Sequence, residues 1–423
     1  MIKKTTYQFL KNVMTLFSGS TLAQIISIGS LIILQRFFYS PEQYAPFRLF
    51  FEYVAIFSSI SALRLESGII LEREEDKAIS LLRICIRLCF IMSIIGGLIF
   101  SIFYFKEIDV FQHEWILLLL MPLAIFGNGL IQVFLPFFTR AKSFLTISSS
   151  KIIHSVIGSC TQILTGFFGF NFIGLVVGRI TGLISADINY LKTFYSKFQW
   201  NKRNKEEEKS LIQKHKKFIY FTSPGIFVGN SINFIILMTF TTLYGEKFTG
   251  LTAAAIQYLG LVVMLFASSF SQVYYNEIAQ IKDPKQLFKS YIFWLKRLFL
   301  LTTAGWIILM LCPSWIVTSV LGEKWVGLMH IIKIISPWMA IMFLASSLSF
   351  IFIRLGKQRE IFFFDVFHLV LILIALSLGH FYLNDKIEVL YIITGAQTLF
   401  YILSISLAYR FLVKNIKEDN TKA

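Results

Sequence analysis

Long apolar runs alternate with short polar segments along the whole chain. Twelve runs are each about 20 residues long, the length at which a helix crosses the roughly 30 Å hydrocarbon core of a bilayer. They cover residues 14–37, 44–65, 81–104, 114–138, 144–166, 172–190, 218–243, 251–274, 291–319, 327–353, 361–380 and 388–412. The pattern predicts an all-α integral membrane protein with about 12 transmembrane helices.

The composition agrees with this prediction. Hydrophobic residues make up 56% of the 423 residues, phenylalanine alone occurs 45 times, and the mean hydropathy is +0.68. A soluble domain with this content would expose far too much apolar surface to water, so a polytopic membrane protein is the class that fits.

The positions of the charges decide what the net charge of +16 means. With the N-terminus inside, the inner segments hold 25 of the 40 Lys and Arg residues, beginning with Lys3, Lys4 and Lys11. The outer loops hold four: Lys106, Lys247, Lys324 and Lys386. This bias follows the positive-inside rule and predicts that both termini are cytoplasmic, without nucleic acid as a partner.

A basic segment at residues 191–217 is the longest stretch outside the predicted spans, and it separates spans six and seven. It predicts an N-terminal six-helix lobe at residues 1–190 and a C-terminal six-helix lobe at residues 218–423. We expect the linker itself to lie on the anionic lipid of the inner leaflet.

One stretch, Tyr44–Ile70, is apolar enough to span a bilayer and yet carries ionisable side chains. At helical spacing Arg48, Glu52 and Glu66 share one stripe, so we expect this helix to form one wall of a polar chamber. Arg64, near the inner end, is interpreted either as part of the chamber's inner rim or as a side chain that extends to the lipid headgroups.

Other polar residues fall within the predicted spans. The cations outnumber the anions among them, which favours an anionic substrate held by charge-assisted hydrogen bonds. Glu52, His154 and Asp365 are candidates for coupling to an ion gradient. The alternatives are that Glu52 is the ion-pair partner of Arg48, that His154 is a hydrogen-bond partner between helices, which is the commoner role, and that Asp365 pairs with a cation to hold the bundle together. The candidates for substrate binding are Arg48, Arg179, Lys151, Lys333, Arg64, Gln24, Asn230 and Gln257.

Catalytic and metal-binding chemistry is not indicated. The four cysteines, Cys85, Cys89, Cys160 and Cys312, lie within predicted spans and do not cluster with histidine at ligand spacing. We therefore expect small packing residues at these positions, no cofactor and no enzymatic activity.

Three segments resemble bacterial polysaccharide repeat-unit flippases of the Wzx type, which serve O-antigen and capsule pathways and belong to the MOP (multidrug/oligosaccharidyl-lipid/polysaccharide) exporter superfamily. LRLESGIILEREEDKAISLL (63–82) is similar to the end of their second span and its loop. YLGLVVMLFASSFSQVYYNEIAQ (258–280) is similar to their eighth span, and LGEKWVGLMHIIKIISPWMAIMFLASSLSFIFIRLGKQ (321–358) to their tenth.

The resemblance implies a MATE-like fold of two six-helix lobes around a cavity that opens alternately to each side of the bacterial inner membrane. The implied substrate is an oligosaccharide repeat unit on undecaprenyl diphosphate, used for O-antigen, lipopolysaccharide, capsule or exopolysaccharide. Membrane lipids, an H⁺ or Na⁺ coupling ion and contact with the polysaccharide polymerase machinery are the other partners that it implies.

Three alternatives stay open at this point. A multidrug or cation antiporter of the same fold would be expected to have an acidic cavity, whereas the deep charge here is mainly positive. A lipid II-type flippase belongs to the same superfamily. A membrane polysaccharide polymerase would use a long outer loop, and the longest one here, around residues 106–113, is about ten residues.

Overall fold

A computed structural model describes residues 19–106, 111, 114–383 and 385–420. Lys3, Lys4 and Lys11, together with most of the outer loop at residues 106–113, lie outside the described residues. Helices account for nearly all of the described chain, and no strand occurs in it, as the apolar pattern predicts.

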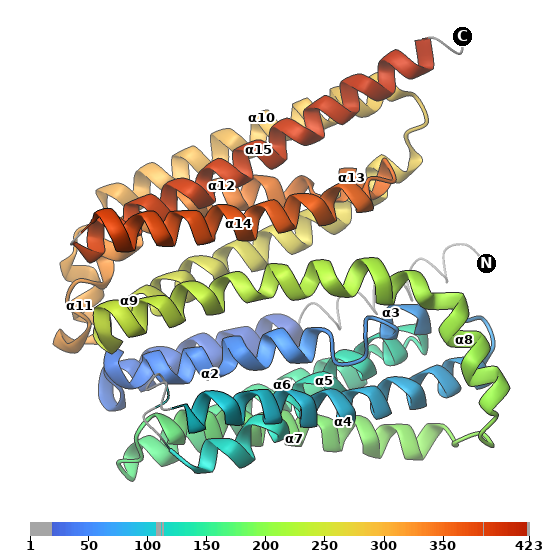
Figure 1. Ribbon diagram of the computed structural model, residues 1–423, viewed down its shortest axis with the longest axis horizontal. Helices are drawn as coiled ribbons and strands as arrows, with labels where there is room; N and C mark the ends of the chain where they lie inside the picture. Colours follow the sequence, from blue (N-terminus) through green and yellow to red (C-terminus); the bar gives the residue numbers. More distant parts are fainter. Residues whose placement is uncertain (1–18, 107–110, 112–113, 384, 421–423) are drawn as a thin grey trace. The chain divides into compact units, whose positions relative to one another are not determined.

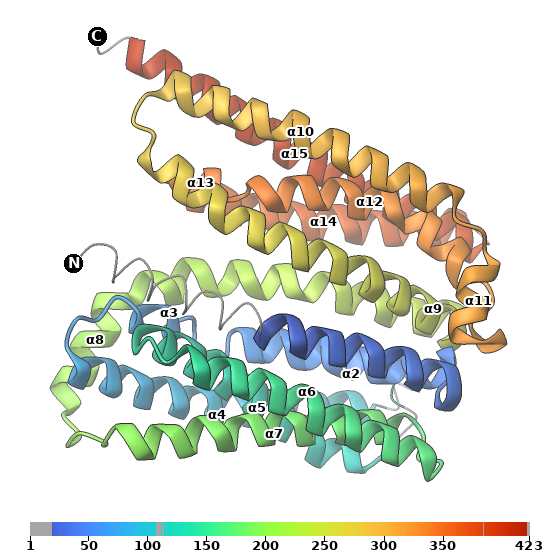
Figure 2. The same cartoon turned by 180° about the vertical axis from the view of Figure 1, so that it is seen from behind.

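The helices run back and forth in long antiparallel segments (Figures 1 and 2). The first described helix covers Gly19–Phe38 and ends in a π-helical turn, η1 (Leu34–Phe38). The others are α2 (Pro41–Ser59), α3 (Glu66–Ile69), α4 (Glu75–Phe105), α5 (Ile116–Arg140), α6 (Phe144–Phe167), α7 (Phe172–Lys197), α8 (Lys205–Lys217), η2 (Phe218–Thr222), α9 (Ser223–Gln280), α10 (Pro284–Leu311), α11 (Trp315–Leu321), η3 (Glu323–Trp325), α12 (Leu328–Leu348), α13 (Phe350–Arg354), α14 (Gln358–Tyr382) and α15 (Lys386–Asn420).

The predicted number of spans agrees with these helices. Nine helical stretches of the described chain are long and apolar enough to cross a membrane. One of them contains two spans, because Gly245 has φ 81° and ψ 167° and breaks α9 into two helices. Adding α2 and α6, which carry more charged and polar residues, gives twelve.

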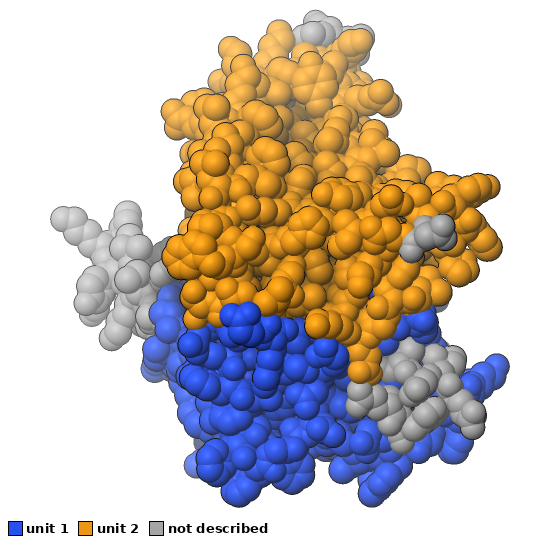
Figure 3. All heavy atoms as spheres, turned by 90° about the vertical axis from the view of Figure 1, so that its left-hand side faces the viewer, with its two compact units in different colours: residues 1–242, 320–324 blue, residues 243–319, 325–423 orange. Residues whose placement is uncertain are grey.

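The chain divides into two compact units (Figure 3). Unit 1 contains residues 1–242 and 320–324, and unit 2 contains residues 243–319 and 325–423. Each unit has its own apolar core, which is the physical requirement for an independently packed body.

The prediction of one continuous helix over Tyr44–Ile70 is wrong. Helix α2 ends at Ser59, and α3 begins only at Glu66. Between them Leu63 and Arg64 adopt left-handed backbone angles, with φ 52° and 60°. These angles cannot continue a right-handed helix, so the charged stripe stops at the end of α2 and Glu66 lies on a separate element.

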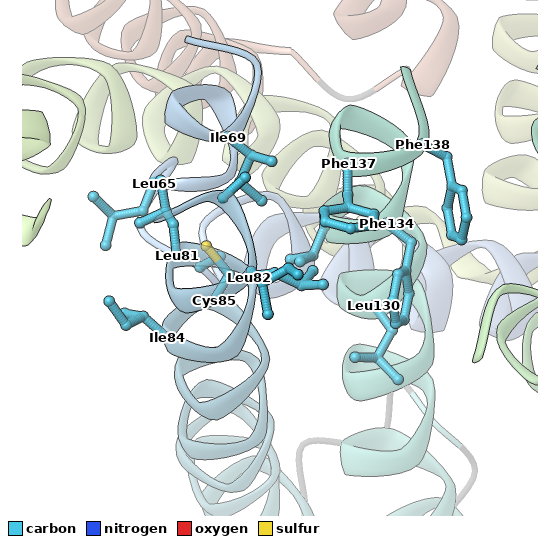
Figure 4. Packing of buried hydrophobic residues seen from close by; sticks show 14 of the residues in the cluster. Leu65, Ile69, Leu81, Leu82, Ile84, Cys85, Leu130, Phe134, Phe137 and Phe138 are labelled. Atoms are coloured by element: carbon cyan, nitrogen blue, oxygen red, sulfur yellow. The ribbon is translucent and has the colours of Figure 1, made fainter. Parts of the chain in front are cut away.

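The turn between α2 and α3 is held by the core of unit 1. Leu65 and Ile69 pack with Leu81 and Cys85 of α4, and Phe134 of α5 belongs to the same cluster (Figure 4). Burial of these apolar side chains offsets the cost of the left-handed residues, which is of order 1–2 kcal/mol each.

Helices α6 and α7 approach each other closely because α7 has glycine at every fourth position. A Cβ atom at Gly174 would lie 2.8 Å from the Thr165 side chain, and one at Gly182 would lie 2.6 Å from the carbonyl oxygen of His154. At Gly178 it would lie 2.7 Å from the Gln162 backbone nitrogen. This is the small-residue spacing that brings helices together in membranes.

Helix α8 lies within the segment predicted as a basic linker. The side chain of Asn204 caps its first turn, three glutamates follow the cap, and the last turn is basic, a charge order that matches the helix dipole. Glu208, Leu211 and His215 are buried on one face against the rest of unit 1.

Candidate functional site

The charged residues of α2 form one pair. Arg48 and Glu52 are one turn apart and are joined by an ion pair. Their side chains are only 20% and 13% exposed, and the Nε atom of Arg48 is buried without a hydrogen-bond partner. Two opposite charges in a largely apolar helix stabilise each other, and the buried Nε donor of Arg48 is left without an acceptor among the described residues.

Arg179 lies on α7 close to this pair. Its guanidinium is 5.8 Å from the centroid of the Phe51 ring, and Arg48 and Tyr44 are near enough to interact with it electrostatically. Arg179 is exposed and forms neither a hydrogen bond nor an ion pair with any residue that the structure describes. An unpaired cation seven residues into an apolar span requires a polar surrounding or an anion.

Polar residues of α6 contact the first described helix. Lys151 donates to Ser20 at 2.9 Å, and the hydroxyls of Ser155 and Ser27 are 3.0 Å apart. Gln24 is half-buried and lies on the first described helix, at helical spacing from Ser20 and Ser27. Hydrogen bonds of this kind are the usual interhelical contacts of membrane bundles, so Lys151 has a structural partner besides any substrate.

His154 connects this face to Arg179. It lies on α6 one turn from Lys151, its Nε2 atom is buried without a partner, and its ring is close enough to Arg179 to feel the electrostatic field of the guanidinium. The structure therefore brings Arg48, Glu52, Arg179 and His154 together within unit 1.

Two other predicted residues of unit 1 lie outside this group. Arg64 is in the left-handed turn, with its Nη1 atom 3.2 Å from the Oε1 atom of Glu66, so it has a structural partner in the turn. Asn230 is half-buried in the first part of α9.

The remaining predicted residues are in unit 2. Lys333 is half-buried on α12, Gln257 on the second part of α9, and Asp365 on α14. Asp365 is one turn from His368, whose Nε2 atom lies 2.7 Å from Gln397 Oε1 and whose ring stacks on Phe400. His368 thus has the role of a hydrogen-bonded packing residue between α14 and α15.

A buried acid, Asp187 on α7, was not among the predicted residues. Only 5% of it is exposed, and its Oδ1 atom has no hydrogen-bond partner. A Cβ atom at Gly127 of α5 would come within 3.2 Å of its Oδ2 atom, so the carboxyl packs directly against α5. The signal available in the sequence was a lone aspartate within the predicted span 172–190.

These side chains can bind and orient a charged ligand without covalent chemistry. Among the residues that the structure describes, no three or more His, Cys, Asp and Glu side chains cluster as a metal site. The arrangement in unit 1 offers guanidinium groups, an ammonium group and amides, which suit phosphate or carboxylate.

A protein-family model described as "Polysaccharide biosynthesis protein" matches residues 33–330. No curated protein matches the sequence.

Solved structures with similar folds are transporters. The lipid II flippase MurJ in an inward closed conformation aligns with a TM-score of 0.71 at 13% identity, over 96% of this chain and 87% of that one. An inward-facing multidrug resistance MATE family transporter of the MOP superfamily aligns with a TM-score of 0.66 at 14% identity, over 94% of this chain and 96% of that one. A MOP superfamily transporter from Pyrococcus furiosus is described as having a binding pocket of reverse polarity. It aligns with a TM-score of 0.59 at 12% identity, over 95% of this chain and 96% of that one.

Proposed function

Because the chain belongs to the family of polysaccharide biosynthesis proteins and has the MOP-superfamily fold of MATE transporters and MurJ, we propose that it flips undecaprenyl-diphosphate-linked oligosaccharide repeat units across the bacterial inner membrane. The predicted family and the all-α MATE-like membrane fold are confirmed, and the cytoplasmic placement of both termini is part of our proposal. The substrate, the direction of transport and the ion coupling are our proposal. Alternating access of two six-helix lobes, residues 1–190 and 218–423, is the proposed mechanism.

The observation that supports this proposal most strongly is Arg179. Its guanidinium is exposed and lacks a carboxylate partner among the described residues, and Arg48 lies nearby with a free donor. Guanidinium groups match the oxygens of a diphosphate in charge and geometry, and the remaining polar side chains suit sugar hydroxyls. The proposed substrate-binding set is Arg48, Arg179, Lys151, Lys333, Arg64, Gln24, Asn230 and Gln257.

Coupling to H⁺ or Na⁺ is proposed to use an acid or a histidine. Glu52, His154 and Asp365 are the candidates from the sequence, and Asp187 joins them because its carboxyl is buried without a full set of partners. Glu52 is the candidate closest to the binding cations, since it already pairs with Arg48.

The charge balance of the site separates the proposed function from its main alternative. A multidrug antiporter for cationic drugs needs free carboxylates in its binding region. Here the one carboxylate in the unit 1 group, Glu52, is neutralised by Arg48, and Arg179 adds an unpaired positive charge. A lipid II-type flippase would handle a substrate of the same diphosphate chemistry.

The test is a clean deletion of the gene in a host without a second copy. We expect lipid-linked repeat units to accumulate on the cytoplasmic leaflet and surface polysaccharide to disappear, with both restored by the gene in trans. Isolating the accumulated lipid identifies the sugar and distinguishes a repeat unit from lipid II. Normal surface polysaccharide together with increased drug sensitivity would refute the flippase and favour the antiporter.

A further inference from the structure

A pocket in unit 1 lies apart from the charged residues described above. It has a volume of about 410 Å³ and is formed by α8, the segment just before it and η2. Four cations line it: Arg203, Lys205, Lys209 and Lys216. We propose that this pocket binds the phosphate headgroup of an anionic membrane phospholipid.

The three lysines of the pocket are arranged along one stripe of α8, and Arg203 lies in the segment just before the helix. Lys205, Lys209, Ile212 and Lys216 are separated by four, three and four residues, so their side chains leave the helix on one face. The buried face, with Leu211 and His215, is a different one. Docking of that second face against unit 1 fixes the direction in which the lysine stripe points.

The lysines are available for a ligand. Lys205, Lys209 and Lys216 are exposed, and none of them has a hydrogen bond or an ion pair with a residue in the described part of the chain. The pocket's one carboxylate, Glu208, is already engaged by Arg87 and Arg203, with Oε-to-nitrogen distances of 3.2 and 3.3 Å. The pocket therefore presents a net positive charge.

Apolar side chains in the same pocket indicate that the anion is part of a lipid. Ile212, Ile219 and Tyr220 line it together with Gln213, and Tyr220 is 68% exposed. The pocket is continuous along the chain with η2 and α9, which begins a membrane span at Ser223. Cations beside exposed apolar groups at the start of a span fit a phosphate with an attached acylglycerol.

The orientation of the chain is consistent with this ligand. The excess of Lys and Arg assigns the α8 side to the cytoplasm, whose leaflet contains the anionic lipids. A free anion such as inorganic phosphate would need the cations but not the exposed isoleucine and tyrosine, and this difference can be measured.

The test uses the full-length protein purified in a neutral detergent. Binding of dioleoyl-phosphatidylglycerol is titrated by native mass spectrometry, with dioleoyl-phosphatidylcholine as the neutral lipid. The pocket variant combines Lys205→Gln, Lys209→Gln and Lys216→Gln. Its matched control combines Lys192→Gln, Lys202→Gln and Lys217→Gln, which removes the same charge from exposed positions outside the pocket.

We expect phosphatidylglycerol to bind the wild type and the control with affinities within about twofold of each other. The pocket variant should bind it at least about tenfold more weakly, because each lysine contributes roughly fivefold to attraction of an anionic lipid. The double variant Ile212→Ser, Tyr220→Ser should also bind phosphatidylglycerol more weakly, with all its charges retained.

Three outcomes would overturn the proposal. One is equal binding of phosphatidylcholine and phosphatidylglycerol by the wild type. Another is an equal loss of phosphatidylglycerol affinity in the pocket variant and its control, which would indicate general attraction of anionic lipid by the basic segment. The third is displacement of the lipid by millimolar inorganic phosphate together with unchanged binding in the Ile212/Tyr220 variant, which would indicate a site for a small anion.

Discussion

The Nε2 atom of His215 lies 2.6 Å from the Oε1 atom of Glu72, a carboxylate 143 residues earlier in the chain. Lys214 adds hydrogen bonds of 2.7 and 2.9 Å to the same carboxylate, and Arg140 donates to the carbonyl oxygens of Glu72 and Arg73. Helix α8 and the loop after α3 are thereby joined outside the membrane spans.

The contact between Glu72 and α8 makes the docking of this helix dependent on pH. Burial raises the pKa of Glu72, but the hydrogen bonds and charges of Lys214 and His215 outweigh burial, and the net pKa lies below its ordinary value of 4.5. The depressed pKa means that the stabilisation is fully present above pH 4.5 and is lost as the pH falls through the lowered value. Thermal unfolding followed between pH 7 and 3 should show this loss.

Replacement of Glu72 tests the same contact at neutral pH. In Glu72→Gln the buried ring of His215 and the exposed Lys214 ammonium lose their carboxylate, and a hydrogen bond to a charged group contributes about 1.5–3 kcal/mol. We expect trypsin to cleave within α8 at least about tenfold faster. Glu360→Gln, which removes an exposed pair with Lys357 in unit 2, serves as the control. An unchanged cleavage rate in Glu72→Gln would contradict the assigned role.

Arg179 should be required for transport but not for folding. Arg179→Ala removes charge-assisted hydrogen bonds to the substrate, each worth about 1.5–3 kcal/mol, so restoration of surface polysaccharide should fall at least about tenfold. Membrane abundance should stay the same, because the side chain is exposed. Full activity of Arg179→Lys would mean that charge suffices without bidentate binding. Arg410→Ala, an exposed arginine of α15, should behave as wild type.

Asp187 should destabilise the fold that contains it. The carboxyl group is buried and its Oδ1 atom lacks a partner, and burying a polar group without a hydrogen bond costs about 1–3 kcal/mol. Asp187→Asn keeps the shape and removes the ionisable group, so we expect equal or higher thermal stability. If Asp187 takes part in ion coupling, transport by this stable variant should lose its dependence on the ion gradient. A strong loss of stability would show instead that the carboxylate is well paired.

The glycines of α7 should be essential for its packing against α6. Gly178→Ala brings a Cβ atom to 2.7 Å from the Gln162 backbone nitrogen, which cannot move away as the end of a flexible side chain could. Overpacking of this kind costs about 1–3 kcal/mol, and the thermal midpoint in detergent should fall accordingly. Gly229→Ala in α9 is the control, because its Cβ atom meets nothing within 4 Å. Equal midpoints in the two variants would refute close packing at Gly178.

The sequence by itself determined the spans and the class of fold. Apolar runs of membrane length are a local property, because each helix satisfies its own backbone hydrogen bonds within the bilayer. The same locality explains why Arg48 and Glu52, one helical turn apart, were correctly expected on one stripe, whereas the continuation of that stripe to Glu66 was wrong. The helix breaks at Leu63 and Arg64 because Leu65 is buried against α4 and α5. This long-range contact cannot be predicted from the local sequence pattern.

Only the tertiary structure decided which charges meet. Glu72 and His215 are joined across 143 residues, and the packing of α7 against α2 places Arg179 over the ring of Phe51, beside the α2 pair. The sequence shows that Lys151, Arg64 and Arg179 are cations within or near spans. Whether each has a partner depends on the folded arrangement: the first described helix supplies Ser20 to Lys151, the turn itself supplies Glu66 to Arg64, and Arg179 is left exposed and unpaired among the described residues.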